Sequence, residues 1–135
     1  MKYLITGGCG FIGSHLAEAL LNNNHQVTVL DDLSTGKFAN VQSFAHSPNF
    51  KALIGSVTDE ALVNEAVRDC DTVFHLASAV GVRLIMEKPV ETIDTIVTGT
   101  QVVLKHANRY RKPLLLTSTS EVYGKSTAVP FDEDG

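Results

Sequence analysis

The residues best suited to chemistry lie near the start of the chain, where glycines recur at short intervals. Gly8, Gly10 and Gly13 fit the pattern G-x-G-x-x-G, and Gly7, Gly10 and Gly13 fit the wider pattern G-x-x-G-x-x-G. Such a turn lets the backbone approach a phosphate closely, and the start of the following helix attracts negative charge. An apolar run precedes the turn and a helical pattern follows it, so we predict a dinucleotide pyrophosphate site. The alternative is a tight turn without a ligand.

A carboxylate follows the second apolar run, at residues 27–30. Asp31 lies about 20 residues beyond the glycine turn, where the adenosine ribose of a dinucleotide is expected. A carboxylate there accepts hydrogen bonds from both ribose hydroxyls and repels a 2′-phosphate, which favours NAD over NADP. Lys37 is a contrary feature, because a cation could pair with a 2′-phosphate. We give Asp31 more weight, and the alternative for it is a simple turn residue after a strand.

The two cysteines, Cys9 and Cys70, are too few for a disulfide framework and lack the spacing of metal ligands. We therefore expect no metal site. Cys9 lies in the glycine turn next to a predicted helix start, which could lower the pKa of its thiol. The interpretation that we favour is that Cys9 is a small residue that fits the turn.

These residues need a scaffold, and the apolar pattern supplies one in which strands alternate with helices. We predict helices at 14–21, 37–45, 61–69 (with an N-cap at Thr58-Asp59) and 89–110, and strands at 3–5, 27–30, 50–54, 72–76 and 114–117. This alternation indicates right-handed βαβ units and a parallel sheet. The fold class is therefore α/β, a Rossmann-type doubly wound parallel sheet in the dinucleotide-binding strand order, and residues 1–135 form one domain.

Composition narrows the functional classes. The chain has 135 residues, of which 44% are hydrophobic and 19% charged, and its net charge is −4. That length suits one domain of about 100–150 residues with a sizeable core. The negative charge and the lack of a basic stripe argue against a nucleic-acid partner. We find no signal peptide before the first predicted strand and no apolar run long enough to span a bilayer. We therefore expect a cytoplasmic location.

The sequence resembles the extended short-chain dehydrogenases/reductases of the NAD-dependent sugar-nucleotide epimerase/dehydratase family. Four segments carry the resemblance, at residues 6–13, 31–36, 75–77 and 117–124. Together they extend over essentially the whole chain. The resemblance implies NAD as cofactor, a nucleotide sugar (a UDP-sugar) as substrate and a homodimer. The residues that it implies for NAD binding are Gly7, Gly10, Phe11, Ile12, Gly13, Asp31, Asp32, Ser34, Thr35, Gly36, Ser56, Val57, Leu76, Ala77, Ser78 and Thr117.

The most specific segment is the last one, and it implies the catalytic residues. By the resemblance, Thr119 hydrogen-bonds the reacting sugar hydroxyl, while Ser120 and Glu121 match the Ser-Glu pair of decarboxylases that act on UDP-glucuronate. The implied reaction is oxidation at C4 of the sugar with NAD, loss of the C6 carboxylate as CO₂, and protonation at C5 with the help of Glu121. The 4,6-dehydratases carry Asp-Glu here and the 4-epimerases small or neutral residues. Both activities stay open, as does a purely structural N-cap role for these residues.

The chain also departs from the family pattern. None of its three tyrosines has a lysine four residues later, so the catalytic Tyr-x-x-x-Lys pair is missing. In the family this pair follows the V-Y-G motif, so we expect the chain to be the N-terminal part of a longer enzyme, truncated after the fifth strand and inactive alone. Ser56 replaces a common aspartate, which moves the expected adenine contact to the backbone around Val57, and Ile96 replaces a common relay asparagine.

Two further expectations follow from the missing part. A sheet that stops at its fifth strand has an unpaired edge, and the long helix keeps an uncovered apolar face, so we expect self-association. An alternative of another class is a non-catalytic NAD-binding module that never had the remaining domain.

Overall fold

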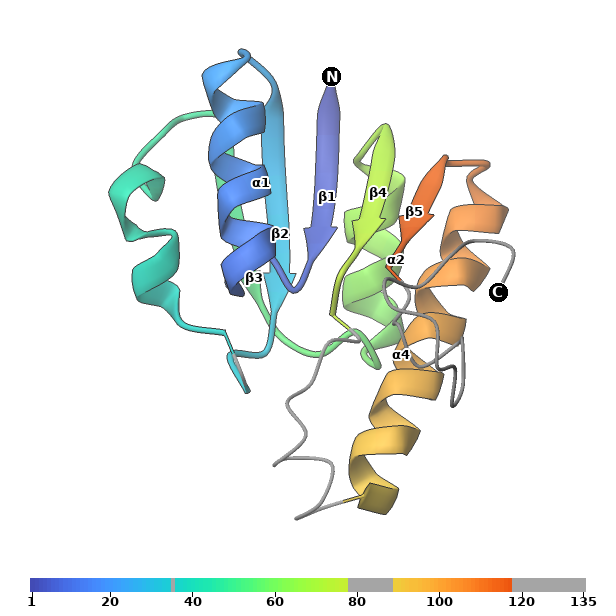
Figure 1. Cartoon of the computed structure of the whole chain (residues 1–135). Coiled ribbons are helices and arrows are strands. Elements are labelled where there is room, and N and C mark those ends of the chain that lie inside the picture. The colour runs from blue at the N-terminus through green and yellow to red at the C-terminus, as the bar shows by residue number, and fades with distance from the viewer. Residues whose placement is uncertain (35, 78–88, 118–135) are drawn as a thin grey trace, which may run out of the picture.

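The computed structural model describes residues 1–34, 36–77 and 89–117. Its centre is a five-stranded parallel sheet in the order β3-β2-β1-β4-β5, the order that the sequence predicts (Figure 1). The strands are β1 (Lys2–Thr6), β2 (Gln26–Asp31), β3 (Phe50–Ile54), β4 (Thr72–His75) and β5 (Leu114–Leu116). The fold is therefore the predicted Rossmann-like α/β class, in which the chain returns through helices to start each strand on the same side.

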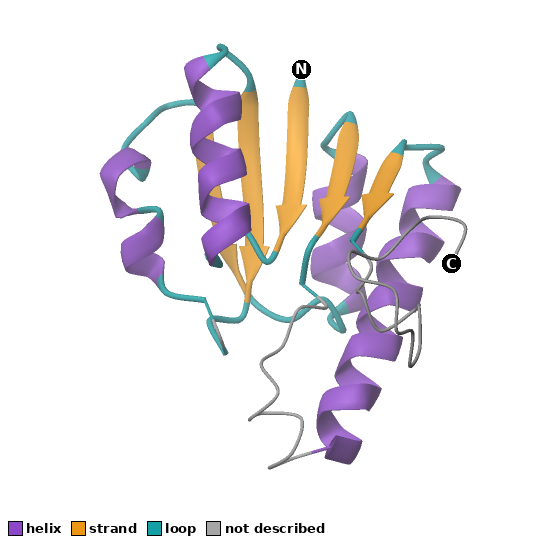
Figure 2. Cartoon of the chain, in the orientation of Figure 1, coloured by secondary structure: helices purple, strands orange, loops and turns teal. Residues whose placement is uncertain are grey.

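The helices cover both faces of the sheet. Figure 2 shows α1 (Phe11–Asn22) on one face, and α2 (Glu60–Arg68) and α4 (Pro89–Arg109) on the other. Side chains alternate along each strand, so Ile5 packs on the α1 side and Leu4 packs on the side of α2 and α4. Because both faces are covered, the central strands carry buried apolar side chains on both faces of the sheet.

The boundaries of the elements follow local signals. The Asp59 carboxylate accepts a hydrogen bond from Leu62 N at 3.2 Å and caps α2, as the sequence predicts. The stretch expected to be helical over 37–45 forms two short 3-10 helices, Phe38–Asn40 and Gln42–Phe44, rather than an α-helix. Val41 between them is fully buried, whereas Phe38 is 42% exposed, so the segment lacks the continuous apolar stripe that a longer helix buries.

All five strands run in the same direction, so the sheet has two unlike edges (Figure 1). We call the edge where the strands end, with Thr6, Asp31 and His75, the carboxyl edge. The edge where they begin, with Lys2 and Gln26, is the amino edge. In parallel α/β sheets ligands bind beyond the carboxyl ends of the strands, so the carboxyl edge is where a site is expected. Among the described residues, no helix is both long and apolar enough to cross a membrane.

Candidate cofactor site

The glycine turn connects β1 to α1 at the carboxyl edge. Gly7 has a φ of 74°, a conformation that side chains with a Cβ rarely adopt, and its N–H donates to Leu30 O at 2.7 Å. A Cβ on Gly13 would overlap the carbonyl oxygen of Gly7, so only glycine lets the helix start this close to the turn. By contrast, the nearest atom to a Cβ on Gly10 would be Gly7 O at 3.3 Å. The turn is therefore tightly packed at Gly13, whereas a Cβ on Gly10 would be close to only one atom, the Gly7 oxygen.

The start of α1 offers backbone N–H groups. Gly10 is the N-cap and makes no side-chain capping bond, and the first turn carries no acidic residue. Phe11 and Ile12 follow it and are 77% and 69% exposed. The first N–H groups of a helix have no intrahelical acceptor and lie at the positive end of its dipole. This helix start therefore fits a phosphate group without any further side chain.

Asp31 ties the turn to the end of β2. Asp31 is only 8% exposed, and its two carboxylate oxygens accept separate backbone hydrogen bonds. Oδ2 accepts from Cys9 N at 2.9 Å, and Oδ1 accepts from Leu33 N at 2.8 Å. Leu33 adopts a φ of 63°, an uncommon conformation for leucine, within this Asx turn. An ionised carboxylate has about four acceptor positions, so acceptor capacity for a ribose diol is left.

The loop after Asp31 folds back onto the glycine turn. The backbone carbonyl of Cys9 accepts from Lys37 N at 3.1 Å and from Asn40 Nδ2 at 2.8 Å. Gly36 packs against the Asp31 carboxylate, since a Cβ there would lie 2.9 Å from Oδ2. The carboxylate of Asp32, an exposed residue, accepts from Ser34 N at 2.9 Å. Of the residues predicted in this loop, Thr35 lies outside the described part of the chain.

Cys9 is fully buried, and burial raises the pKa of its thiol to about 11, with the Asp31 charge as a smaller cause. The possibility that the helix start lowers this pKa does not agree with the structure, because desolvation of the thiolate and the Asp31 charge both raise it. The favoured interpretation, a small residue that fits the turn, agrees with the structure. The sequence does not show that the backbone of Cys9 is the point where the turn, Asp31 and the following loop meet.

The loop after β3 adjoins the same edge. Gly55 N donates to Asp31 O at 3.0 Å, and the Ser56 and Thr58 hydroxyls lie 2.7 Å apart. Val57 is buried among the side chains of α2 and α4. With that side chain in the core, the backbone and Ser56 are the parts of this loop that are left to contact a ligand. The adenine contact stays a prediction.

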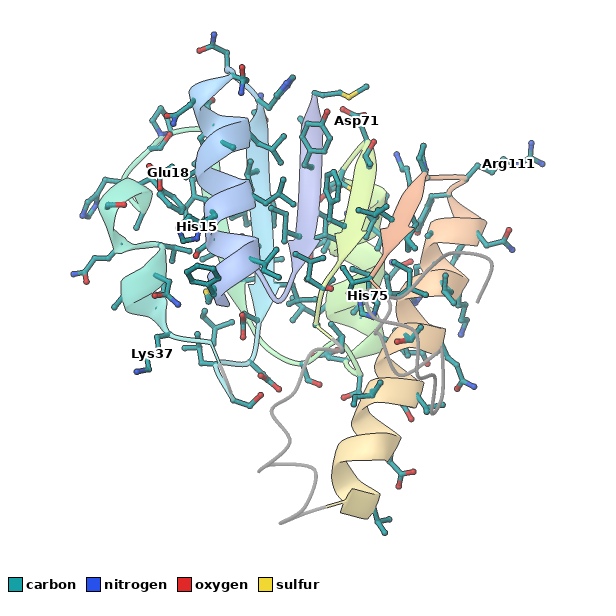
Figure 3. The ribbon with its side chains drawn as sticks, viewed as in Figure 1. His15, Glu18, Lys37, Asp71, His75 and Arg111 are labelled. Atoms are coloured by element: carbon teal, nitrogen blue, oxygen red, sulfur yellow. The ribbon has the colours of Figure 1, made fainter. Side chains whose placement is uncertain are left out.

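The end of β4 completes the edge. Leu76 N donates to Thr6 O at 3.1 Å, so the segment after β4 starts beside the glycine turn. Thr117 follows β5, and its hydroxyl donates to His75 O at 3.3 Å. Figure 3 shows His75 at the carboxyl end of β4, on the side of α4. Ser78 and the predicted catalytic residues Thr119, Ser120 and Glu121 lie outside the described residues.

Sequence reasoning included His75 only as part of the segment 75–77 and gave it no role of its own. His75 is 1% exposed, and burial lowers the pKa of its imidazole to about 4. Its ring nitrogens contact the hydroxyls of Thr6 and Thr100, at 2.6 Å and 3.1 Å. The signal was a histidine inside an apolar strand, since a buried polar side chain requires hydrogen-bond partners.

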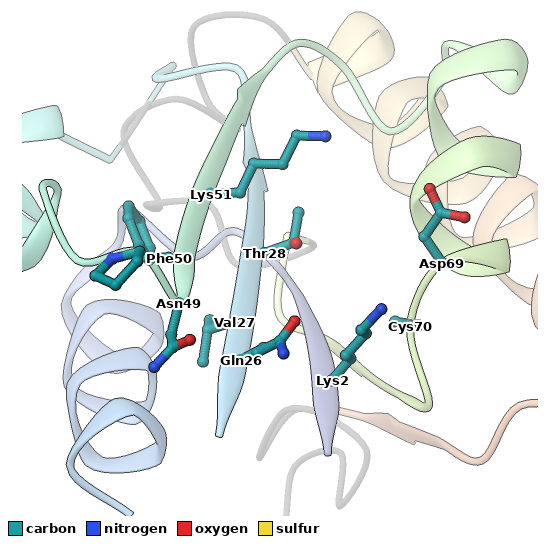
Figure 4. Close-up of a pocket in the computed structure, with 10 residues that line it drawn as sticks. Lys2, Gln26, Val27, Thr28, Asn49, Phe50, Lys51, Asp69 and Cys70 are labelled. Atoms are coloured by element: carbon teal, nitrogen blue, oxygen red, sulfur yellow. The ribbon is translucent and has the colours of Figure 1, made fainter. Parts of the chain in front are cut away.

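Two other kinds of site are not supported at this edge. Within the described ranges, no group of three His, Cys, Asp or Glu side chains is arranged to hold a metal ion. A pocket does exist, but it lies at the amino edge (Figure 4) and none of the predicted cofactor residues lines it. Its lining consists of Lys2, Gln26, Val27, Thr28, Pro48, Asn49, Phe50, Lys51, Asp69 and Cys70.

The sheet order, the glycine turn and the acidic end of β2 define a Rossmann-type fold built for a dinucleotide. Comparison with known proteins then gives the family. The chain matches the family model described as GDP-mannose 4,6 dehydratase over residues 4–135, and it belongs to that family.

Relatives and a solved structure agree with this assignment. The UDP-N-acetyl-alpha-D-glucosaminuronate decarboxylase of Bacillus cytotoxicus is 44% identical over 133 residues, which are 98% of this chain and 40% of that protein. UDP-glucuronic acid decarboxylase 1 of Danio rerio is 38% identical, over 98% of this chain and 31% of that protein. The dTDP-glucose 4,6-dehydratase DesIV of Streptomyces venezuelae, solved with NAD and TYD bound, superposes with a TM-score of 0.87 at 32% identity, covering 95% of this chain and 42% of that one. This chain thus spans well under half of each relative's length.

Proposed function

We propose that this chain is the NAD-binding portion of a sugar-nucleotide-modifying enzyme. The main observation in support of the proposal is that the Asp31 carboxylate accepts two backbone hydrogen bonds. The carboxylate accepts from Cys9 N in the glycine turn and from Leu33 N in the next loop, at 2.9 Å and 2.8 Å. A pyrophosphate cradle and a diol acceptor are thereby held in a fixed relation, which is what a dinucleotide requires.

The residues at the carboxyl edge fit NAD in three parts. The turn beside Gly10 and the exposed start of α1 at Phe11 and Ile12 suit the pyrophosphate. The Asp31 carboxylate suits the adenosine ribose hydroxyls, and its charge disfavours a 2′-phosphate. The segment at Leu76 and Ala77 suits the other end of the dinucleotide, as do Thr117 and Ser78 by resemblance. When bound, NAD supplies reversible oxidation of a sugar hydroxyl.

The test is calorimetric titration of the protein with NAD and with NADP. Asp31→Ala should weaken NAD binding by about 1–3 kcal/mol, because it removes a buried hydrogen-bond acceptor. Asp71→Ala is a matched control, since Asp71 also accepts a backbone N–H, from Lys2 N at 2.8 Å, but at the amino edge. Unchanged NAD affinity in the Asp31 variant, or equal losses in both variants, would remove Asp31 from the site.

For the reaction, we propose decarboxylation of a UDP-linked uronic acid, most like UDP-glucuronate. Two features support it: two relatives are named as such decarboxylases, and Ser120-Glu121 matches the pair found in that group. In this proposal Thr119 hydrogen-bonds the reacting hydroxyl and Glu121 handles the proton at C5. UDP-sugar 4-epimerase and 4,6-dehydratase activities are the alternatives.

The assay uses the complete enzyme that contains this sequence, with UDP-glucuronate and its 2-acetamido analogue as separate substrates. Release of CO₂ is expected from at least one of them, and Glu121→Gln should reduce the rate while leaving NAD affinity unchanged. Formation of an epimeric sugar without CO₂ would contradict decarboxylation and favour the epimerase.

A non-catalytic NAD-binding module is the second candidate. NAD binding without any turnover of UDP-sugars by the complete protein would support the module and contradict the enzyme.

We further propose self-association through α4, as a homodimer in the complete protein. Val90, Val97 and Leu104 recur every seven residues along α4 and are 71%, 48% and 43% exposed. Residues seven apart lie on one face of a helix, so they form an apolar stripe. Sedimentation should show species larger than a monomer, and Val97→Lys should shift them toward monomer. A monodisperse monomer of the unaltered chain would contradict this proposal.

A further inference from the structure

We propose that Thr6, His75 and Thr100 form a chain of hydrogen bonds that positions the segment after β4 for the dinucleotide, with Thr100 acting as a positioning residue. The inference rests on the proposed NAD site but concerns residues outside the predicted set. It joins three elements that are far apart in sequence, namely the end of β1, the end of β4 and the middle of α4.

The contacts of the Thr6 hydroxyl determine its role. Its oxygen accepts from Ala77 N at 3.2 Å and shares the Leu76 N–H, 3.1 Å away, with the backbone carbonyl of Thr6. A threonine hydroxyl has two acceptor lone pairs and one donor hydrogen, so both lone pairs are in use. Since two N–H groups are directed at this oxygen, we assign its hydrogen to His75 Nδ1, 2.6 Å away. Thr6 is fully buried, so no water replaces any of these partners.

Counting hydrogen-bond donors and acceptors in the same way gives the tautomer of His75. Because Nδ1 accepts from Thr6, the ring hydrogen of the neutral imidazole lies on Nε2. Nε2 then donates to Thr100 Oγ1 at 3.1 Å. A protonated ring would carry a second donor at Nδ1 facing a hydroxyl without a free acceptor. Burial, which lowers the pKa of His75 to about 4, is consistent with the neutral form.

This chain bears directly on the candidate site. Leu76 and Ala77 belong to the predicted cofactor residues, and their N–H groups are held by the Thr6 side chain. The backbone of Ala77 also lies against Gly7, where a Cβ would come within 3.0 Å of it. The segment after β4 is thus fixed to the glycine turn through Thr6, and to α4 through His75 and Thr100.

The test is Thr100→Val, which keeps the shape of the side chain and removes the acceptor for His75 Nε2. Calorimetry with NAD should show an affinity about five- to tenfold weaker, the effect of one lost hydrogen bond. Affinity for AMP, which occupies only the half of the site around Asp31, should stay unchanged. Thr100→Ser retains the hydroxyl and should restore NAD binding.

Nitrogen NMR of His75 in the unaltered protein gives a readout that does not depend on a variant. We expect the Nε2–H tautomer, with Nδ1 unprotonated, and mixed tautomers in Thr100→Val. An Nδ1–H tautomer in the unaltered protein would overturn the proposal, as would equal losses of NAD and AMP affinity in Thr100→Val. Failure of the unaltered protein to bind NAD, with the Nε2–H tautomer present, would instead contradict the proposed function alone.

Discussion

At each edge of the sheet an aspartate carboxylate accepts backbone N–H groups, but the two aspartates differ in burial and in the number of these hydrogen bonds. At the carboxyl edge, Asp31 is 8% exposed and accepts two backbone N–H groups. At the amino edge, the carboxylate of Asp71 accepts one backbone N–H, from Lys2, in an exposed position. The first carboxylate joins parts of the chain that must stay together, whereas the second caps the start of one strand. The number of buried bonds, rather than the residue type, distinguishes the candidate site.

The two edges of the sheet also differ in the groups that they present. The pocket at the amino edge is lined by scattered polar and charged side chains, including Lys2 and Lys51 (Figure 4). The carboxyl edge presents the glycine turn and the exposed start of α1, at Gly10, Phe11 and Ile12. A dinucleotide pyrophosphate is recognised mainly by main-chain groups of this kind, so side-chain pockets elsewhere are a poor guide to the site in this fold.

The largest effect expected at the carboxyl edge is acid destabilisation through His75. Its pKa of about 4 in the folded state lies below the ordinary 6.5, so the unfolded chain binds more protons between these values. Its contribution to the free energy of unfolding is complete above pH 6.5 and is lost as the pH falls to about 4, a change of about 3 kcal/mol. Denaturant titrations at several pH values should show this loss to be absent in His75→Asn. Parallel pH profiles of the two proteins would contradict the burial of this imidazole.

The next effect compares the two aspartates directly. Asp31→Ala leaves the N–H groups of Cys9 and Leu33 without their acceptor, and should lower the free energy of unfolding by about 2 kcal/mol. Asp71→Ala frees an N–H at an exposed position where water can replace the carboxylate, so its loss should be under about 0.5 kcal/mol. Chemical denaturation measures both, and equal losses would remove the distinction between the edges.

A smaller effect is expected where α4 meets the loop after β3. A Cβ on Gly99 would overlap the side chain of Val57, which is itself buried in the core. Gly99→Ala gains about 1 kcal/mol from helix propensity, but the added methyl group overpacks the contact with Val57. The second effect is larger, so the free energy of unfolding should fall by about 1 kcal/mol. Gln101→Ala on the exposed face of the same helix is the control. A stabilised Gly99→Ala protein would show that Val57 can move.

The smallest difference is expected between the two cysteines, one near each edge. Burial raises the pKa of both thiols from 9.0 to about 11. The thiolate fraction at neutral pH is thus about a hundredfold below that of an unperturbed cysteine, and both should react slowly with iodoacetamide. Mass spectrometry of timed samples measures the rates. Rapid modification of Cys9 alone would show that the helix start does activate it.

Much of the fold could be predicted from the sequence, because local signals agreed with the global pattern. β3 lies at Phe50–Ile54 as predicted, Asp59 caps α2, and the parallel strand order is the predicted one. The stretch at 37–45 was harder, since it buries Val41 without a helical stripe. Its conformation depends on contacts with Cys9, through Lys37 and Asn40, that no local pattern reveals.

The motifs of the candidate site could be predicted from the sequence, but the hydrogen bonds that join its residues could not. Glycine spacing and an acid after a strand indicate the cradle and Asp31. The partnership of Thr6, His75 and Thr100 depends on contacts between residues 69 and 25 positions apart in the sequence. Single-sequence patterns report short-range periodicity, so contacts of this kind fall outside what they encode.

Cys9 illustrates a consequence for how such sequences diverge. Its contacts with Asp31, Lys37 and Asn40 all use its backbone N–H and carbonyl, and its side chain only fills space. A small apolar residue that fits this space can keep the same backbone contacts, although the position is central to the site. Alanine at this position should therefore preserve the backbone contacts that hold the turn, whereas serine would bury a hydroxyl in an apolar cluster.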